Sequence, residues 1–175
     1  VTYCFGTDGE DTEIAWNWVH HNRAESCGVG IYIDNGSANF RIHHNVSWAN
    51  ENSGIRLNTP SHNNLVAHNT VLHNGDSVHY WGADNNSDQE GCRLINNIFT
   101  DEVVTGTGME VSHNYAGQEP GLANPGNQDF RLKDDSPCIS VGITLEGIPQ
   151  EHQGKAPDLG AYAHGFDPWK PGHDW

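Results

Sequence analysis

The chain has 175 residues, enough for one domain, but only 35% of them are hydrophobic and 20 are glycine. Its formal net charge of −15 argues against nucleic acid and an anionic membrane surface as partners. The same charge disfavours a densely anionic polysaccharide unless a cation bridges the two. No apolar run approaches the roughly 20 residues that a membrane-spanning helix needs.

The first residues form a predicted strand and corner whose pattern returns later in the chain. Residues 1–9 (VTYCFGTDG) align with residues 79–84 (HYWGAD), in the middle of a repeating unit. An open end of a repeat stack exposes unpaired strand edges. We therefore expect that upstream repeats are missing from the chain, or that another chain covers this end.

Between residues 14 and 115 the sequence repeats itself. IAWNWVHHN (14–22), IHHNVSWAN (42–50) and VAHNTVLHN (66–74) share an apolar residue followed by two asparagines; RLINNIF (93–99) is a fourth copy and VSHNY (111–115) a weaker fifth. The aligned asparagines are 28, 24, 28 and 17 residues apart. Short apolar runs separated by turn residues at this period predict a solenoid of stacked parallel strands, since no repeat can bury its apolar side alone.

Three columns of mainly asparagine mark the predicted corners. They are Asn17/Asn45/Asn69/Asn97, Asn22/Asn50/Asn74, and Asn39/Asn63 with Asp11 and Gly91 in register. Asn adopts the left-handed conformation of a tight corner more readily than most residues, and its amide can bond to the next Asn in the stack. Each turn is therefore predicted to have three corners.

Two segments, GIYIDNGSANFRIHHNV and GIRLNTPSHNNLVAHNTVL, closely resemble rungs of the pectate-lyase-like superfamily in secreted bacterial carbohydrate-active proteins. The resemblance covers about residues 1–116. It implies an all-β fold, a right-handed parallel β-helix, and a secreted, extracellular or periplasmic location. Because this superfamily includes lyases, hydrolases, epimerases and non-catalytic fibres, the resemblance does not select a chemistry.

The second strand of each repeat carries the predicted functional site. Alignment without gaps puts Tyr32, Arg56 and Tyr80 in one outward-pointing column, and Asp34 and Asn58 end the same strands. Aromatic rings and a guanidinium beside a carboxylate suit a polysaccharide partner. A shift of one residue in the third repeat would replace Tyr80 by its neighbour.

We predict two sets of site residues on these strands. The catalytic set is Asp34, Arg56 and Tyr80, and the substrate-binding set is Tyr32, Asn58 and His79. In a lyase, Arg56 would neutralise a uronate carboxylate while a Tyr or His removes the adjacent proton. In a hydrolase, Asp34 would need a second carboxylate about 5–9 Å away. Nearby candidates are Glu25, Glu51 and Asp76. The alternative is an inert Asp34–Arg56 surface pair with aromatic residues filling the strands.

The histidines and acidic residues give no clear metal site. His44 and His68 precede ladder asparagines and should be neighbours in the stack, but no Asp or Glu shares their column. A metal site needs three or four converging ligands, so we predict stacked neutral histidines and assign no metal ligand. Asp84, Asp88 and Glu90 in a polar corner loop make calcium a possible cofactor, although their spacing matches no established calcium loop.

The tail, residues 117–175, departs from the repeat and is rich in proline and glycine. Its DFRL, SP and PDLGAY elements resemble the terminal segment of many secreted bacterial β-helix proteins, although Cys138, Ser140 and Ala163 depart from that pattern. We expect residues 1–116 to form the rungs and the tail to form an irregular cap over the edge of the last rung. The four cysteines, Cys4, Cys27, Cys92 and Cys138, leave both disulfides and isolated thiols open.

Two functions follow from these patterns. The first is polysaccharide cleavage, by a lyase or a glycoside hydrolase, on the outer face of the helix. The alternative is a non-catalytic module that binds glycans or serves as a structural fibre. The enzyme needs converging ionisable groups on that face, whereas the binding module needs only the aromatic rings.

Overall fold

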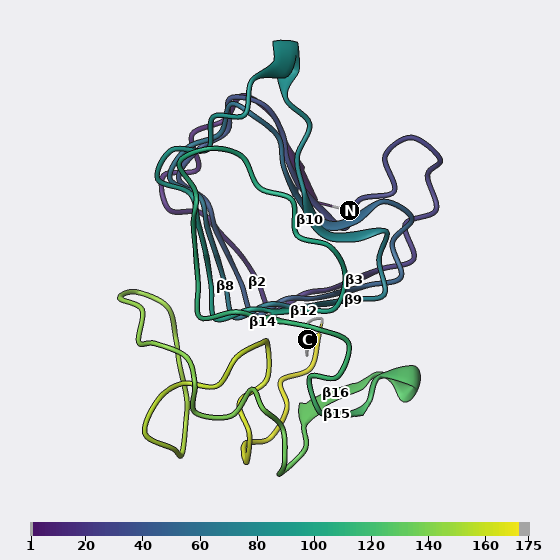
Figure 1. The fold of residues 1–175 in the computed structure, drawn as a ribbon, viewed down its shortest axis with the longest axis vertical. Coiled ribbons are helices and arrows are strands. Elements are labelled where there is room, and N and C mark those ends of the chain that lie inside the picture. The colour runs from purple at the N-terminus through teal and green to yellow at the C-terminus, as the bar shows by residue number, and fades with distance from the viewer. Residues whose placement is uncertain (1, 172–175) are drawn as a thin grey trace, which may run out of the picture.

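The computed structural model describes residues 2–171, and as far as Ala116 the chain winds into a parallel β-helix (Figure 1). Each turn contributes short strands that pair in parallel with the strands of the next turn, which produces three sheets. The predicted all-β, right-handed parallel β-helix is confirmed.

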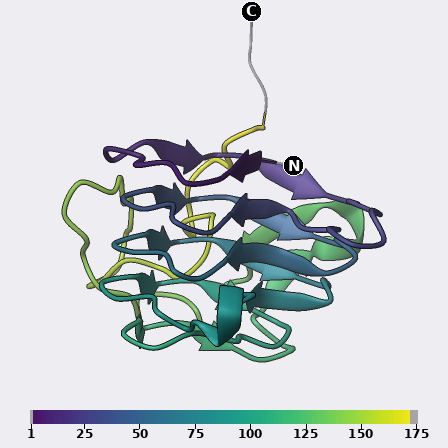
Figure 2. The same ribbon diagram turned by 90° about the horizontal axis from the view of Figure 1, so that it is seen from above.

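The three sheets form the sides of a triangle in Figure 1, and Figure 2 shows the turns stacked on one another. Sheet 1 contains β1 (Thr2–Cys4), β4 (Ile31–Ile33), β7 (Ser53–Leu57) and β10 (Asp76–His79). Sheet 2 contains β2 (Glu13–Ala15), β5 (Arg41–His43), β8 (Leu65–Ala67), β11 (Arg93–Ile95) and β13 (Glu110–Ser112). Sheet 3 contains β3 (Trp18–His20), β6 (Val46–Trp48), β9 (Thr70–Leu72), β12 (Ile98–Phe99) and β14 (Tyr115–Ala116).

The helical elements are short turns outside the sheets. They are η1 (Ala83–Asn85), which projects from the top corner in Figure 1, and η2 (Pro125–Asn127) in the tail. Over residues 2–171, no helix has the length and apolar character needed to cross a membrane.

The interior of the triangle is filled by apolar side chains from alternate strand positions. In sheet 1, Ile31 and Ile33 flank the outward Tyr32, and Ile55 and Leu57 flank the outward Arg56. These four aliphatic side chains are fully buried. Burying one such side chain contributes about 1.5–3 kcal/mol, so the repeated apolar positions supply the driving force for stacking.

The first predicted asparagine column is a continuous hydrogen-bonded ladder. The amide nitrogens of Asn17, Asn45, Asn69 and Asn97 each donate to the side-chain oxygen of the next Asn, ending at Asn114, over 2.9–3.0 Å. The amides of Asn45, Asn69 and Asn97 also donate to backbone carbonyls of their own turn and of the previous turn, as Asn69 does to Ala67 and Ile42. The ladder therefore satisfies polar backbone groups that the corner buries.

The left-handed residue at two of the three corners differs from the prediction. In the third column, Asp11, Asn39 and Asn63 have positive φ, as expected. In the other two columns the residue before the ladder Asn has positive φ instead, for example His44 at 51° and His68 at 50°. In these corners the ladder Asn supplies hydrogen bonds only. The left-handed backbone conformation falls on the preceding residue, often His, which adopts a positive φ more readily than most residues.

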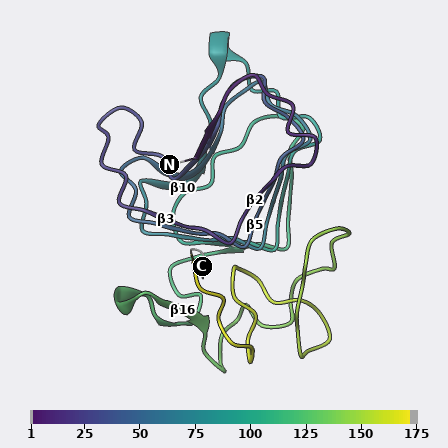
Figure 3. The same ribbon diagram turned by 180° about the vertical axis from the view of Figure 1, so that it is seen from behind.

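The tail lies along the outer face of sheet 3, as Figures 1 and 3 show. It includes the antiparallel hairpin β15 (Leu122–Asn124) and β16 (Asp129–Leu132). Its apolar residues bury outward side chains of sheet 3, which are Val46, Trp48, Leu72 and Ile98. The tail thus covers the side of the stack, whereas we expected it to cover the edge of the last rung. The reason is that sheet 3 has apolar side chains on its outer face as well as its inner face, and the tail removes the outer ones from water.

The four cysteines are isolated thiols. Cys92 and Cys138 are buried, Cys4 is partly buried, and Cys27 is exposed in a loop before β4. The sequence left disulfides and isolated thiols open, and the structure contains isolated thiols.

Candidate functional site

The outward row of sheet 1 contains most of the predicted site. Tyr3, Tyr32, Arg56 and His79 are in register, one from each strand. Two residues further along each turn, a second row continues with Phe5, Asp34, Asn58 and Trp81. These two rows form the sheet 1 face.

Tyr80 was wrongly placed in the first row. The alignment assumed corners of equal length, but the corner before β10 is one residue shorter, so His79 pairs with Arg56. Val78 takes the inward position opposite Ile55 and is buried. The apolar side chain of Val78 was the sequence signal for this register, because it would otherwise have pointed into solvent.

Arg56 lies on the outer side of its strand but is covered rather than exposed. Its guanidinium carbon is 3.9 Å from the centroid of the Trp81 ring and 5.8 Å from that of Tyr32, and only 2% of the residue is accessible. One nitrogen, Nη2, donates to the Ser53 hydroxyl at 2.7 Å. Nε and Nη1 have no hydrogen-bond partner among the described residues. Burial lowers the pKa of Arg56.

Asp34 is held in a polar network. Its carboxylate accepts hydrogen bonds from the Tyr3 hydroxyl at 2.9 Å, from the Asn58 amide at 2.8 Å and from the backbone N–H of Asn35 at 2.8 Å. Asn58 also donates to the Tyr32 hydroxyl at 2.8 Å. Among the described ion pairs, none joins Asp34 to Arg56.

The hydrogen bonds and pKa values of this network disfavour a role for Asp34, Tyr3 or Tyr32 as a general acid or base. Burial is the main cause that raises the pKa of Tyr32 to about 12, so its phenol stays protonated near neutral pH. The hydrogen bond to Asp34 is the main cause that raises the pKa of Tyr3. Of the carboxylates suggested as partners for Asp34, Glu51 contacts Arg23 instead, at 3.5 Å. The residues that sequence reasoning missed here are Tyr3, Phe5 and Trp81. Tyr3 aligns with Tyr32 in the first row, and the aromatic residues Phe5 and Trp81 follow two positions after Tyr3 and His79.

A second cluster lies at the corner between sheets 2 and 3. The ring of Trp16 stacks on His44, with centroids 4.2 Å apart, and His44 stacks on His68 at 5.1 Å. Asn96 continues the column and contacts the His68 Nε2 at 3.0 Å. This column, Trp16–His44–His68–Asn96, is called the corner stack, and it confirms the predicted stacking of the two histidines.

Both stacked histidines are neutral at physiological pH. Burial is the main cause that lowers the pKa of His44 to about 2 and that of His68 to about 4. For His44, the neighbouring rings of His68 and His43 act in the same direction.

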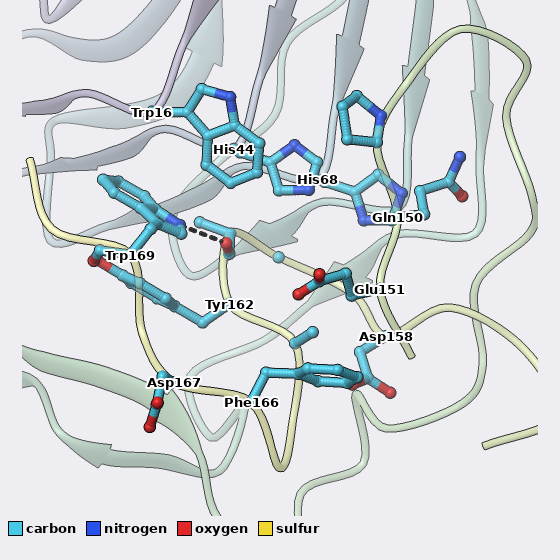
Figure 4. A pocket seen from close by; sticks show the side chains of 14 residues that line it. Trp16, His44, His68, Gln150, Glu151, Asp158, Tyr162, Phe166, Asp167 and Trp169 are labelled. Carbon is cyan, nitrogen blue, oxygen red and sulfur yellow. Dashed lines mark hydrogen bonds between the residues drawn. The ribbon is translucent and has the colours of Figure 1, made fainter. Parts of the chain in front are cut away.

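A pocket of about 320 Å³ opens between the corner stack and the tail (Figure 4). Its aromatic side chains are Trp16, Tyr162, Phe166 and Trp169. Its polar side chains are His44, His68, Gln150, Glu151, Asp158 and Asp167. This corner pocket was not predicted, because the tail residues that build it carry no repeat signal.

The comparisons with known proteins concern the rungs most directly. The model of the family described as "Periplasmic copper-binding protein (NosD)" matches residues 5–117. The chain belongs to the NosD family. The periplasm in this description agrees with the expected secreted or periplasmic location. A search of curated proteins finds no match for the NosD-family chain.

The fold of this NosD-family chain is similar to that in "Crystal structure of pectate lyase Pel9A", with a TM-score of 0.67 and 21% sequence identity. The match covers 92% of this chain and 49% of the lyase, so the chain spans about half the length of that protein. At this identity the likeness shows the shared β-helix and says nothing of the reaction.

The family description names copper, which proteins bind through His, Cys, Met and carboxylate side chains. Within residues 2–171, no group of three or more His, Cys, Asp or Glu side chains is placed to hold a metal ion, and this includes Asp84, Asp88 and Glu90. The histidines occur in contacting pairs, such as His20 and His21, whose Nδ1 atoms are 2.8 Å apart. The described part of the chain therefore does not fit a copper site built from three or more of these side chains.

Proposed function

We propose that this protein binds a polysaccharide along the sheet 1 face and does not cleave it. The observation that carries the proposal is the pair of exposed aromatic regions at the two ends of this face. Tyr3 is 55% exposed and Phe5 is 62% exposed in the first turn, and Trp81 is 44% exposed after β10. The strands between them span about 14 Å at the usual strand spacing, so one sugar chain can contact both ends.

The chemistry of these side chains suits sugar rings. An aromatic face stacks on the apolar side of a sugar, and the partly exposed carboxylate of Asp34 can accept hydrogen bonds from hydroxyl groups. Asn58 is buried, and its amide positions the Asp34 carboxylate and the Tyr32 hydroxyl. Arg56 supports Trp81 from below through a cation–π contact, so the ring is held in place before any ligand arrives. Preorganisation of this kind lowers the entropic cost of binding.

Three features favour binding over cleavage. Asp34 already accepts three hydrogen bonds, Tyr32 holds its proton firmly, and Trp81 covers the guanidinium of Arg56. A general acid or base must instead reach the reacting atoms and change its protonation state. The net charge of −15 further favours a neutral polysaccharide over one rich in carboxylates.

Native affinity electrophoresis in gels that contain neutral or acidic polysaccharides tests this proposal. We expect a neutral polysaccharide to retard the protein and Trp81→Ala to weaken the interaction about fivefold, because a stacked ring contributes roughly 1 kcal/mol. Val141→Ala, which removes an exposed apolar side chain of the tail, is the matched control and should leave the mobility unchanged. Equal retardation of wild type and Trp81→Ala would contradict the proposal.

A lyase remains the second candidate because of a specific observation. The buried nitrogens Nε and Nη1 of Arg56 and Nδ1 of His79 are neighbours in one row, and none has a hydrogen-bond partner among the described residues. The two Arg56 nitrogens are donors that would suit a uronate carboxylate if Trp81 moved aside. The lyase predicts a rise in ultraviolet absorbance from unsaturated sugar ends, abolished by Arg56→Ala, whereas the binding module predicts no rise with any polysaccharide.

A further inference from the structure

The corner pocket has a composition that differs from that of the sheet 1 face. Among the described residues that line it, there is no lysine or arginine, whereas Glu151, Asp158 and Asp167 are acidic. The two histidines in its wall add no positive charge near neutral pH, because burial keeps them unprotonated. The pocket therefore combines negative charge with aromatic rings.

Glu151 is the acidic residue best placed to meet a ligand. In Figure 4 its carboxylate extends into the space between Tyr162 and His68, above the ring of Phe166. Within residues 2–171, its carboxylate makes no hydrogen bond and no ion pair. Asp158 differs, because its two oxygens accept the backbone N–H groups of Ser140 and His164 at 2.7 Å and so hold the tail in shape.

The aromatic wall is rigidly held. Trp169 stacks on Tyr162 with centroids 4.8 Å apart and packs edge-to-face on Trp16 at 5.6 Å. Its indole N–H donates to the Ala161 carbonyl at 2.9 Å, and the Tyr162 hydroxyl accepts from Trp18 at 2.9 Å. These polar ends are thus already paired, so Tyr162 and Trp169 line the pocket with the ring surface that their mutual stacking leaves uncovered rather than with new donors.

We propose that the corner pocket binds a small organic cation, with its ammonium group between the carboxylate of Glu151 and the rings of Phe166, Tyr162 and Trp169. A cation over an aromatic face is attracted by the ring quadrupole, and a nearby carboxylate adds a direct charge pair. The volume of about 320 Å³ suits a ligand no larger than a monosaccharide. The ammonium group can belong to a quaternary amine or to an amino sugar. This site is independent of the polysaccharide proposed for the sheet 1 face.

Calorimetric titration with matched pairs of probes tests the charge requirement. The first pair is choline and its neutral carbon analogue, in which a tert-butyl group replaces the trimethylammonium group. The second pair is glucosamine and glucose. We expect at least one cation to bind about tenfold or more tightly than its neutral partner. Preference for choline identifies a quaternary amine, and preference for glucosamine identifies an amino sugar. Equal binding within both pairs, or no binding of either cation up to about 10 mM, would overturn the proposal.

Two variants locate the binding. Glu151→Gln keeps the size of the side chain and should weaken binding of the preferred cation by about threefold to fivefold, because an exposed charge pair contributes up to about 1 kcal/mol, while binding of the neutral partner stays unchanged. Glu146→Gln removes an exposed charge of the tail outside the pocket and is the control. If the control weakens binding as much as Glu151→Gln does, the cation responds only to the net charge and the pocket assignment is wrong. Thermal unfolding of both variants verifies that they remain folded.

Discussion

At the scale of single residues, Asn69 shows how one side chain completes a buried corner. Its amide donates to the carbonyls of Ile42 and Ala67 and to the Asn97 side chain, while its oxygen accepts the backbone and side-chain N–H groups of Asn45. The residue is fully buried, so no water replaces these partners. Leaving buried polar groups unpaired costs roughly 1–3 kcal/mol for each group.

We therefore predict that Asn69→Ala lowers the free energy of unfolding by about 3 kcal/mol or more. Chemical denaturation measures this change. Asn17→Ala is the matched control, because Asn17 stands at the exposed end of the ladder and should cost about 1 kcal/mol or less. Equal losses for the two variants would show that the ladder does not act through burial.

The corner stack predicts a pH dependence of stability. His44 and His68 have pKa values of about 2 and about 4 in the folded protein, below the roughly 6.5 of an unfolded chain. Between these values the unfolded state binds more protons, so stability falls as the pH is lowered through about 6.5. From about pH 7 to about pH 5 the loss should be roughly 2 kcal/mol for each histidine.

Denaturation at several pH values checks this expectation, with the double variant His44→Asn and His68→Asn as the comparison. Asn already occupies this column at Asn96 with a φ of 60°, so the backbone conformation is compatible with the substitution. In the double variant the free energy of unfolding should change less with pH between about pH 7 and about pH 5. The same slope in both proteins would assign the effect to other groups.

At the scale of elements, the repeat explains why most strands were predictable. A buried apolar residue at alternate positions and an Asn at a fixed offset recur in each turn, so the sheets follow from the pattern. The register of β10 did not follow from the Asn spacing, because its corner is one residue shorter. The register of β10 is instead set by the alternation of inward and outward side chains, which places Val78 inward opposite Ile55. The burial of Arg56 was also missed, since it depends on Trp81, which follows β10 in the next turn and covers the guanidinium.

The contact between the tail and sheet 3 gives a prediction at this scale. Phe130 of β16 packs on Trp48 and Trp18, with centroids 4.9 and 5.5 Å away, and is 2% exposed. Phe130→Ala should destabilise the tail by about 3–5 kcal/mol. Limited proteolysis should then cut first within residues 117–171. Cleavage that begins equally often in the rungs would contradict a separately released tail.

At the scale of the whole molecule, the β-helix separates two kinds of surface. The sheet 1 face carries exposed rings around a paired polar network, and the opposite corner carries an acidic, aromatic pocket completed by the tail. The fold was predictable because successive turns repeat the same pattern of inward apolar residues and ladder asparagines. The corner pocket was not, because its walls come from segments that are distant in sequence and have no period. Many proteins share this fold, so the proposed function is inferred from the side chains on the outer faces of the β-helix rather than from the fold itself.

Hydrogen exchange with and without a neutral polysaccharide tests the central proposal most directly, because it locates the ligand on one face. We predict slower exchange across the strands of sheet 1, which are β1, β4, β7 and β10, and in the residues up to Phe5 and Trp81, with no change in the tail over sheet 3. Protection confined to the tail, or none in the presence of a polysaccharide that retards the protein in gels, would contradict binding on the sheet 1 face.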